Sequence, residues 1–326
     1  MIDLSGSVNV IYSPSGETEL ARLAAEVDTW SRATGVPVTL TRLSDHKDGL
    51  VAHLSATDTA TTIVQVTPDV LVNLTQAKLL AAPPDDVVDP AVRACLGAAF
   101  EVDGRLWAVP KDYSLISLYR LDGQTQSTPT FMNPVYERIA PFLFAHGGGT
   151  VLDGGGGPDS RLGNLEGVRR LQSLLRAGDL VFPQTHGHHN TVAAARSGLA
   201  RSALEGPWLR QEVPLAWSEE SVRPLTGGDT TLALCGGWAA TVGTSEAGWD
   251  LVRWLTAPDT LDRLAAGGGP RPAHRAPDHS GYRLLRPTAG ARTAIWAWQS
   301  LIGRLPEDPP ELLAAALSVS STQELT

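Results

Sequence analysis

The sequence has little cysteine, no long apolar run and no excess of basic residues, and each shortage excludes a class of protein. Two cysteines in 326 residues, Cys95 and Cys235, are too few for a disulfide framework. No apolar run reaches the roughly 20 residues that a membrane-spanning helix needs. The net charge of −9 argues against the phosphate backbone of a nucleic acid as partner. We therefore expect globular domains that do not bind nucleic acid.

The N-terminus also lacks the features of a secretion signal. Met1-Ile2-Asp3-Leu4 has neither a basic start nor an apolar core of the usual length before the first predicted strand. Two interpretations stay open. Either the chain is extracytoplasmic, secreted or membrane-anchored, and its leader is not part of this sequence, or it is a cytoplasmic protein.

The beginning of the chain predicts a parallel sheet. A length of 326 residues with 42% hydrophobic content is enough for two cores. Val8–Tyr12 alternates as a strand does, Glu17 opens an amphipathic helix that Gly35 closes, and Val36–Leu40 supplies a second strand. A strand, a helix and a strand in this order form a βαβ unit, which favours an α/β fold.

The stretch from Thr230 to Leu255 contains the strongest pattern in the chain. Thr231–Cys235 predicts a buried strand, and we expect it to end at Gly236-Gly237, where the backbone has no Cβ atoms. Trp238 would then stand at the end of a strand. An amphipathic helix follows up to Leu255.

Other segments give shorter predictions. Asp69–Val72 is typical of a buried strand, Asp103-Gly104 of a hairpin turn, and Glu166–Ala177 of a helix closed by glycine. The glycine-rich segments 145–150 and 153–157 lack the spacing of a phosphate-binding loop, so we interpret them as flexible turns. Trp296 and Trp298 lie on a predicted helix and are expected in a core.

Several segments, taken in order, resemble one protein family. Phe100–Pro110, Gly198–Trp208, Thr230–Leu255 and Gly268–Pro272 are similar to the extracellular solute-binding proteins of ABC importers, in the sugar-binding branch of the maltose-binding proteins. The resemblance implies a two-lobed, periplasmic-binding-protein-like α/β fold with a hinge and an inter-lobe cleft. Lobe 1 would comprise residues 1–115 and 232–270, and lobe 2 residues 116–231 and 271–326. Compared with the family pattern, about one βα unit is missing after residue 121, so we expect a reduced lobe 2.

The resemblance also implies which residues bind a ligand. Sugars stack their C–H faces on aromatic rings and exchange hydrogen bonds with charged side chains, with no cofactor and no bond broken. The candidate ligand-binding residues are Glu17, Asp112, Tyr113, Glu205, Trp208, Gly236, Gly237, Trp238 and Arg271. The family's role would be to deliver a sugar or oligosaccharide, as a monomer, to an ABC permease.

Each of these residues also has a simpler interpretation as a packing residue, and other functions stay open. A glycoside hydrolase would need two carboxylates at a defined separation, for which Asp112 and Glu205 are candidates, but no motif supports catalysis. The loop with His186, His188 and His189 either binds a transition metal or is an exposed polar loop, which we favour. A cytoplasmic ligand-binding or interaction protein could reuse the fold without a transporter.

Overall fold

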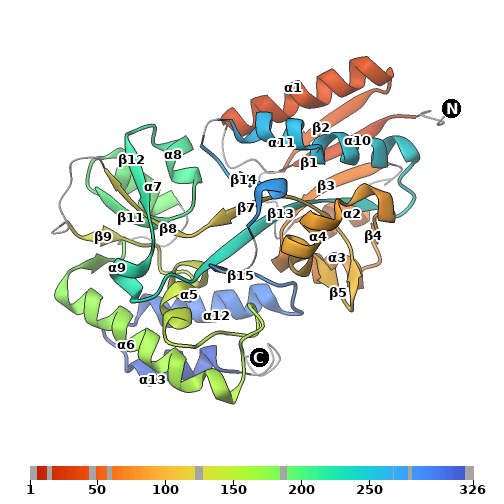
Figure 1. Cartoon of the computed structure of the whole chain (residues 1–326). Coiled ribbons are helices and arrows are strands. Elements are labelled where there is room, and N and C mark those ends of the chain that lie inside the picture. The colour runs from red at the N-terminus through yellow and green to blue at the C-terminus, as the bar shows by residue number, and fades with distance from the viewer. Residues whose placement is uncertain are drawn as a thin grey trace. The chain divides into compact units, whose positions relative to one another are not determined.

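The computed structural model describes residues 6–12, 17–43, 49–56, 61–121, 128–183, 189–266, 268–277 and 281–319. The chain forms two compact units (Figure 1), and each is described here by itself. The first unit comprises Met1–Tyr113 and Cys235–Asp278, and the second comprises Ser114–Leu234 and His279–Thr326. The chain therefore passes between the units near Tyr113, Leu234 and Asp278.

The first unit is built on the predicted parallel sheet. Strand β1 (Val8–Tyr12) lies between β2 (Val38–Arg42) and β3 (Thr62–Val66) and runs parallel to both. Helix α1 (Glu17–Thr34) joins β1 to β2, and Gly35 follows it with a φ of 76°, a conformation that favours glycine. The βαβ prediction is confirmed.

The other elements of the first unit complete this sheet and cover it. The sheet order is β14-β7-β13-β3-β1-β2, with β4 on β13. The remaining elements are α2 (Leu50–Ala56), α3 (Pro68–Gln76), β4 (Leu80–Ala81), η1 (Asp85–Val87), α4 (Pro90–Leu96), η2 (Gly97–Ala99), β5 (Glu101–Val102), β6 (Arg105–Leu106), β7 (Val109–Leu115), β13 (Thr231–Thr241), α10 (Glu246–Thr256), α11 (Pro258–Ala265), β14 (Arg271–Pro272) and η4 (Ala273–Arg275). Strands β7 and β13 continue into the second unit.

Strand β13 does not end at the glycine pair, so that prediction is wrong. It continues to Thr241, and Trp238 lies within it, opposite Gln65 of β3. The glycines keep the strand close to its neighbours. A Cβ on Gly236 would lie 2.7 Å from Asp112 Oδ1, and one on Gly237 would lie 2.8 Å from the Phe100 ring. The missing side chains thus allow close packing rather than a turn.

Two shorter predictions in this unit had different outcomes. Asp69–Val72 is helical, not a strand, because Pro68 occupies the first turn of α3 and favours helix initiation after the extended Thr67. The hairpin is confirmed: β5 pairs with β6, and both Asp103 and Gly104 have positive φ values.

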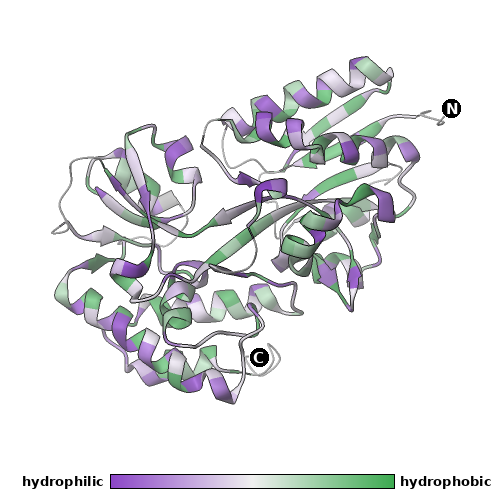
Figure 2. Cartoon of the chain, in the orientation of Figure 1, coloured by the Kyte–Doolittle hydropathy of each residue, from purple (hydrophilic) through white to green (hydrophobic). Residues whose placement is uncertain are grey.

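The second unit combines a small sheet with a group of helices. Its sheet has the order β10-β9-β11-β8-β12. The elements are β8 (Ser117–Leu121), β9 (Thr130–Phe131), α5 (Tyr136–Ala145), η3 (Pro158–Ser160), α6 (Arg161–Ala177), β10 (Leu180–Val181), α7 (His189–Arg196), β11 (Ser202–Glu205), α8 (Trp208–Glu212), β12 (Trp217–Glu220), α9 (Arg223–Thr226), β15 (Tyr282–Leu284), α12 (Ala291–Gly303) and α13 (Pro310–Leu317). Helices α5, α6, α12 and α13 enclose one apolar core, and Figure 2 shows both hydrophilic and hydrophobic residues on α6, as expected for an amphipathic helix.

Predicted details of the second unit also had mixed outcomes. Helix α6 ends at Gly178 in the left-handed conformation, as predicted. The glycine-rich segments are not simple flexible turns, because Asp153 is buried there and accepts hydrogen bonds from Tyr136 and the Thr150 backbone. Trp298 is buried as expected, but Trp296 is 60% exposed, so its assignment to a core is wrong.

The compact units differ from the predicted lobes at their edges. Residues 271–278 belong to the first unit rather than the second, because β14 pairs with β7 at Asp112 and Tyr113. Residues 232–234 belong to the second unit, where β13 pairs with β15. The second unit is no shorter than the first. The shortening of lobe 2 relative to the family pattern stays a prediction.

We predict that Gly237→Ala destabilises the protein by about 2 kcal/mol, the usual range for overpacking a core. The new Cβ would meet the Phe100 ring at 2.8 Å and the Val109 carbonyl oxygen at 3.1 Å, and a paired strand cannot move away from both. Urea unfolding measures the change. Gly281→Ala is the matched control, because nothing lies within 4 Å of its Cβ position. Equal midpoints for the two variants would contradict the prediction.

Candidate functional site

A buried charged cluster lies beside the glycine pair in the first unit. The Lys111 ammonium contacts the Asp112 carboxylate and lies 3.6 Å from Glu19 Oε1. The second oxygen of Asp112, Oδ1, accepts a hydrogen bond of 3.0 Å from the Gly236 backbone N–H. Strand β7 thus supplies the cation and one carboxylate, and helix α1 supplies the other carboxylate.

Burial and the neighbouring charges shift the pKa values of the side chains in this cluster. Loss of solvent raises the pKa of Asp112, and this effect exceeds the opposing influence of Lys111. Burial lowers the pKa of Lys111, but attraction to Asp112 and Glu19 is stronger, so its pKa is raised. Burial, with the nearby Glu19, also raises the pKa of the Tyr12 hydroxyl. Lys111 therefore stays protonated between the Asp112 and Glu19 side chains.

Trp238 lies next to this cluster on β13 and is 1% exposed. Its ring stacks on Tyr12, with 5.9 Å between centroids and 28° between planes. Its indole Nε1–H is buried and, within the described part of the chain, has no hydrogen-bond acceptor. Buried donors are nearly always paired, by protein, water or ligand. This donor is the clearest unsatisfied group among the predicted site residues.

The neighbouring strands position two further candidates. Tyr113 follows Asp112 on β7, is buried, and donates a 3.2 Å hydrogen bond from its hydroxyl to the Arg275 carbonyl oxygen. Arg271 is half-buried and pairs with Tyr113 through β14. The structure therefore brings Asp112, Tyr113 and Arg271 together with the β13 residues.

Glu17 differs from the residues of the buried cluster in its exposure to solvent. Its side chain is exposed and forms a 2.6 Å ion pair with Arg42. It begins α1, as predicted, but the preceding residues 13–16 lie outside the described residues. Its role as a ligand contact stays a prediction.

In the second unit, Glu205 and Trp208 form a compact arrangement with Arg138 of α5. Glu205 is fully buried and accepts two hydrogen bonds from the Arg138 guanidinium, one of them 3.1 Å from Nε to Oε2. Trp208 donates its indole N–H to Glu205 at 2.9 Å, and the Arg138 guanidinium lies 5.1 Å from the Trp208 ring centroid. A Cβ on Gly206 would overlap that ring, so glycine is required at this position.

Sequence reasoning did not include Arg138 or Glu19 among the site residues. Arg138 lies on a helix 67 positions before Glu205, and no local spacing connects the two. Glu19 is two residues after the predicted Glu17, so helical geometry alone could have suggested that only one of them faces the sheet. Lys111 directly precedes Asp112, so the sequence alone places a basic residue next to this candidate carboxylate.

The described residues contain no grouping of three or more His, Cys, Asp or Glu side chains that could hold a metal ion. Residues 184–188, with His186 and His188, lie outside the described residues, so the metal hypothesis stays open there. Within the described ranges, no helix is both long and apolar enough to cross a membrane.

Comparison with known proteins shows similarity in structure rather than in sequence. No family model and no curated protein sequence matches the chain. The maltotriose-binding protein of Thermus thermophilus, solved with maltotriose, is 16% identical with a TM-score of 0.76, covering 98% of this chain and 100% of its own. The GacH receptor of Streptomyces glaucescens, solved unliganded and with acarbose, is 12% identical with a TM-score of 0.79, covering 96% and 97%.

A cyclo/maltodextrin-binding protein solved with maltotetraose is also similar, at 14% identity and a TM-score of 0.75, covering 98% of this chain and 97% of that one. The chain therefore has the two-lobed periplasmic-binding-protein fold, as predicted, and its architecture is that of maltose- and maltodextrin-binding proteins. The names of these three neighbours describe two sugar-binding proteins and a receptor.

We predict that Arg138→Met lowers the free energy of unfolding by about 3–5 kcal/mol at neutral pH, because it leaves the Glu205 carboxylate buried without its cation. An unpaired buried carboxylate has a raised pKa, so the variant is most stable below the unfolded Glu value of about 4.3 and loses stability as pH rises. Urea unfolding at pH 5 and pH 7.5 measures this.

Arg169→Met is the matched control, since Arg169 is on a neighbouring helix and its ion pairs with Glu166 and Glu311 are exposed. It should change stability little at either pH. If both variants behaved alike, the Arg138–Glu205 pair would not have the importance we assign to it.

Proposed function

We propose that this chain binds a sugar or oligosaccharide and delivers it to an ABC importer from an extracytoplasmic location. The observation that carries the proposal is the fold shared over nearly the whole chain with three proteins solved with maltotriose, acarbose or maltotetraose. Fold alone does not fix function, so the residues of the candidate site provide the second argument.

The chemistry of the first unit supports a polyhydroxylated ligand. A carbohydrate hydroxyl is both a donor and an acceptor, so it would pair with the Trp238 Nε1–H in a conformation that exposes this buried group. The carboxylate of Asp112 and the guanidinium of Arg271 provide the charged hydrogen-bonding groups that such a ligand needs. We propose that Gly236 and Gly237 contribute indirectly, because their missing side chains let Asp112 and Phe100 pack against β13.

The same residues support binding better than hydrolysis. Glycoside hydrolysis needs one carboxylic acid and one carboxylate beside the scissile bond. Glu205 is fully buried and held by Arg138, and Asp112 is held by Lys111 and the Gly236 N–H. Carboxylates held in this way are suited to orienting other groups, whereas a reacting carboxyl must be free to exchange protons with substrate.

The transporter partner is the finer part of the proposal. A ligand-binding protein that reuses this fold without a permease is the alternative. Permease genes next to the native gene, together with export of the tagged full-length native product, would support delivery to an importer. A cytoplasmic product with no permease in its neighbourhood would favour the alternative.

We predict that the chain binds maltotriose, maltotetraose or acarbose in isothermal titration, and that Trp238→Phe weakens this binding about fivefold. Phenylalanine keeps an apolar ring beside Tyr12 but removes the Nε1–H, and one hydrogen bond contributes about 1 kcal/mol. Trp296→Phe is the control, because that ring is exposed on α12 and outside the candidate site. Absence of heat with all three sugars, with the protein shown to be folded, would oppose a maltodextrin ligand. Unchanged affinity in Trp238→Phe would remove Trp238 from the site.

A further inference from the structure

The buried charged cluster of the first unit is connected to Trp238 through Tyr12. Tyr12 is the last residue of β1 and is 2% exposed. Its ring stacks on the Trp238 indole, and its hydroxyl is hydrogen-bonded to the Glu19 carboxylate of α1. The same carboxylate lies 3.6 Å from the Lys111 ammonium. Glu19 therefore contacts both the aromatic pair and the charged cluster.

These contacts form a closed ring that begins and ends on strand β13. Lys111 contacts Asp112, and Asp112 Oδ1 accepts a 3.0 Å hydrogen bond from the Gly236 N–H. Gly236 and Trp238 are two positions apart on β13. The strand is therefore held by its backbone at Gly236, through Asp112, and by a side chain two residues later, through Tyr12.

Stability alone does not account for a charged cluster of this kind. The desolvation of buried ions offsets much of their mutual attraction, and apolar side chains of similar volume often stabilise a protein equally well. A satisfied polar network fixes one arrangement of its side chains, which apolar packing does less well. A phenylalanine at position 12 would also stack on Trp238, but only the tyrosine hydroxyl is anchored to Glu19.

We propose that Glu19 is a positioning residue of the carbohydrate site, which acts through Tyr12 to hold the Trp238 indole in its binding orientation. The inference rests on the function proposed above, in which the Trp238 Nε1–H pairs with a ligand hydroxyl. A hydrogen bond weakens steeply when donor and acceptor are misaligned, so an indole that can tilt would bind the ligand less tightly. Glu19, rather than the exposed Glu17, is then the residue of α1 on which the site depends.

Labelling with 5-fluorotryptophan tests the orientation of the indole in the sugar-free protein. The chain has nine tryptophans, and the ¹⁹F resonance that is missing from Trp238→Phe belongs to Trp238. Glu19→Met removes the acceptor of the Tyr12 hydroxyl, and Tyr12→Phe removes the donor. Each substitution should shift or broaden the Trp238 resonance. An unchanged Trp238 resonance in both folded variants would overturn the proposal.

Glu26→Met is the matched control. Glu26 is also a buried carboxylate of α1, but its ion pair is with Arg263, at 2.6 and 2.9 Å, and it has no part in the ring of contacts. This variant should lose stability and keep the Trp238 resonance in place. A shift of that resonance as large as in Glu19→Met would show a general effect of disturbing α1 and would refute the specific role of Glu19.

Isothermal titration with maltotriose tests whether the orientation matters for binding. Glu19→Met and Tyr12→Phe should each weaken binding about fivefold, the effect of one hydrogen bond of about 1 kcal/mol. Because both break the same hydrogen bond, the double variant should also lose about fivefold rather than about 25-fold. Effects that multiply in the double variant would show that Glu19 does not act through Tyr12.

The two measurements separate this inference from the carbohydrate function itself. If maltotriose binds equally to the unsubstituted chain and to Glu19→Met, the positioning role fails and the carbohydrate function remains. If the unsubstituted chain binds no sugar, the carbohydrate function fails, and the ¹⁹F resonance alone decides whether Glu19 positions the indole.

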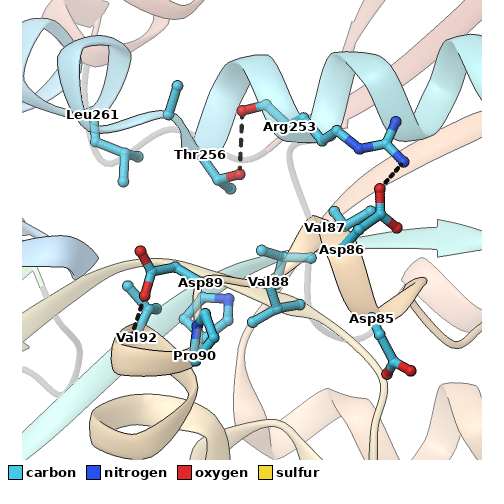
Figure 3. Close-up of a pocket in the computed structure, with 13 residues that line it drawn as sticks. Asp85, Asp86, Val87, Val88, Asp89, Pro90, Val92, Arg253, Thr256 and Leu261 are labelled. Atoms are coloured by element: carbon cyan, nitrogen blue, oxygen red, sulfur yellow. Dashed lines mark hydrogen bonds and ion pairs between the residues drawn. The ribbon is translucent and has the colours of Figure 1, made fainter.

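A separate cavity of the first unit provides a check on location. It lies between the η1–α4 segment and the residues from the end of α10 into α11 (Figure 3), has a volume of about 500 Å³, and is lined by no residue of the ring. Ala257 is half-buried on its wall, so Ala257→Phe reduces the space. This variant should bind maltotriose as the unsubstituted chain does. Loss of binding in folded Ala257→Phe would place the sugar in that cavity and overturn the role of Glu19.

Discussion

Strand β13 carries the chain from one compact unit into the other without a break, and its neighbours can pack against it only because two residues lack side chains. At Gly236 and Gly237 the side chains of Asp112 and Phe100 occupy the space where Cβ atoms would lie. Asp112 then reaches the Gly236 N–H, which fixes the carboxylate against the backbone. The position of the whole buried cluster in the first unit follows from this close approach.

The second constraint is the energetic cost of burying a charge, and in each unit a buried carboxyl group is paired with a cation. A carboxylate transferred from water into a protein interior is costly unless a cation and further donors accompany it. Asp112 has Lys111 and a backbone N–H, and Glu205 has Arg138 and the Trp208 indole. In the second unit Glu205 accepts hydrogen bonds from Arg138 and from the Trp208 indole. Beside the cluster of the first unit, the Trp238 Nε1–H is buried without an acceptor among the described residues.

The sequence predicted the fold well where the information was local. Helical spacing and a closing glycine located α1 and α6, and the Asp103-Gly104 pair located the hairpin, because turn and cap geometry depend on a few adjacent residues. The predictions failed where a distant contact decided the outcome. Gly236-Gly237 has the composition of a turn, but its extended geometry is set by β3 and β7 on either side.

The candidate site was predictable in its residue types but not in its pairings. Asp112, Trp238 and Arg271 could be chosen as candidate ligand-binding residues from their sequence segments. The ion pair between Arg138 and Glu205 could not be predicted, because the two residues are 67 positions apart and no periodic sequence pattern connects them. The tryptophans of α12 show the same limit, since exposed Trp296 and buried Trp298 are only two positions apart on that helix. Which face packs depends on elements brought in by the tertiary fold.

Identity of 12–16% with TM-scores of 0.75–0.79 has a physical explanation in these observations. A fold requires apolar residues at the right period, glycine where backbones approach, and capped helix ends, and many sequences meet those requirements. Ligand recognition requires specific groups at specific atoms, and these can change while the fold persists. The two charged arrangements illustrate this distinction. The Arg138–Glu205–Trp208 groups are engaged with one another and stabilise the second unit, whereas the Lys111–Asp112–Glu19 cluster lies beside the Trp238 Nε1–H, which has no acceptor among the described residues.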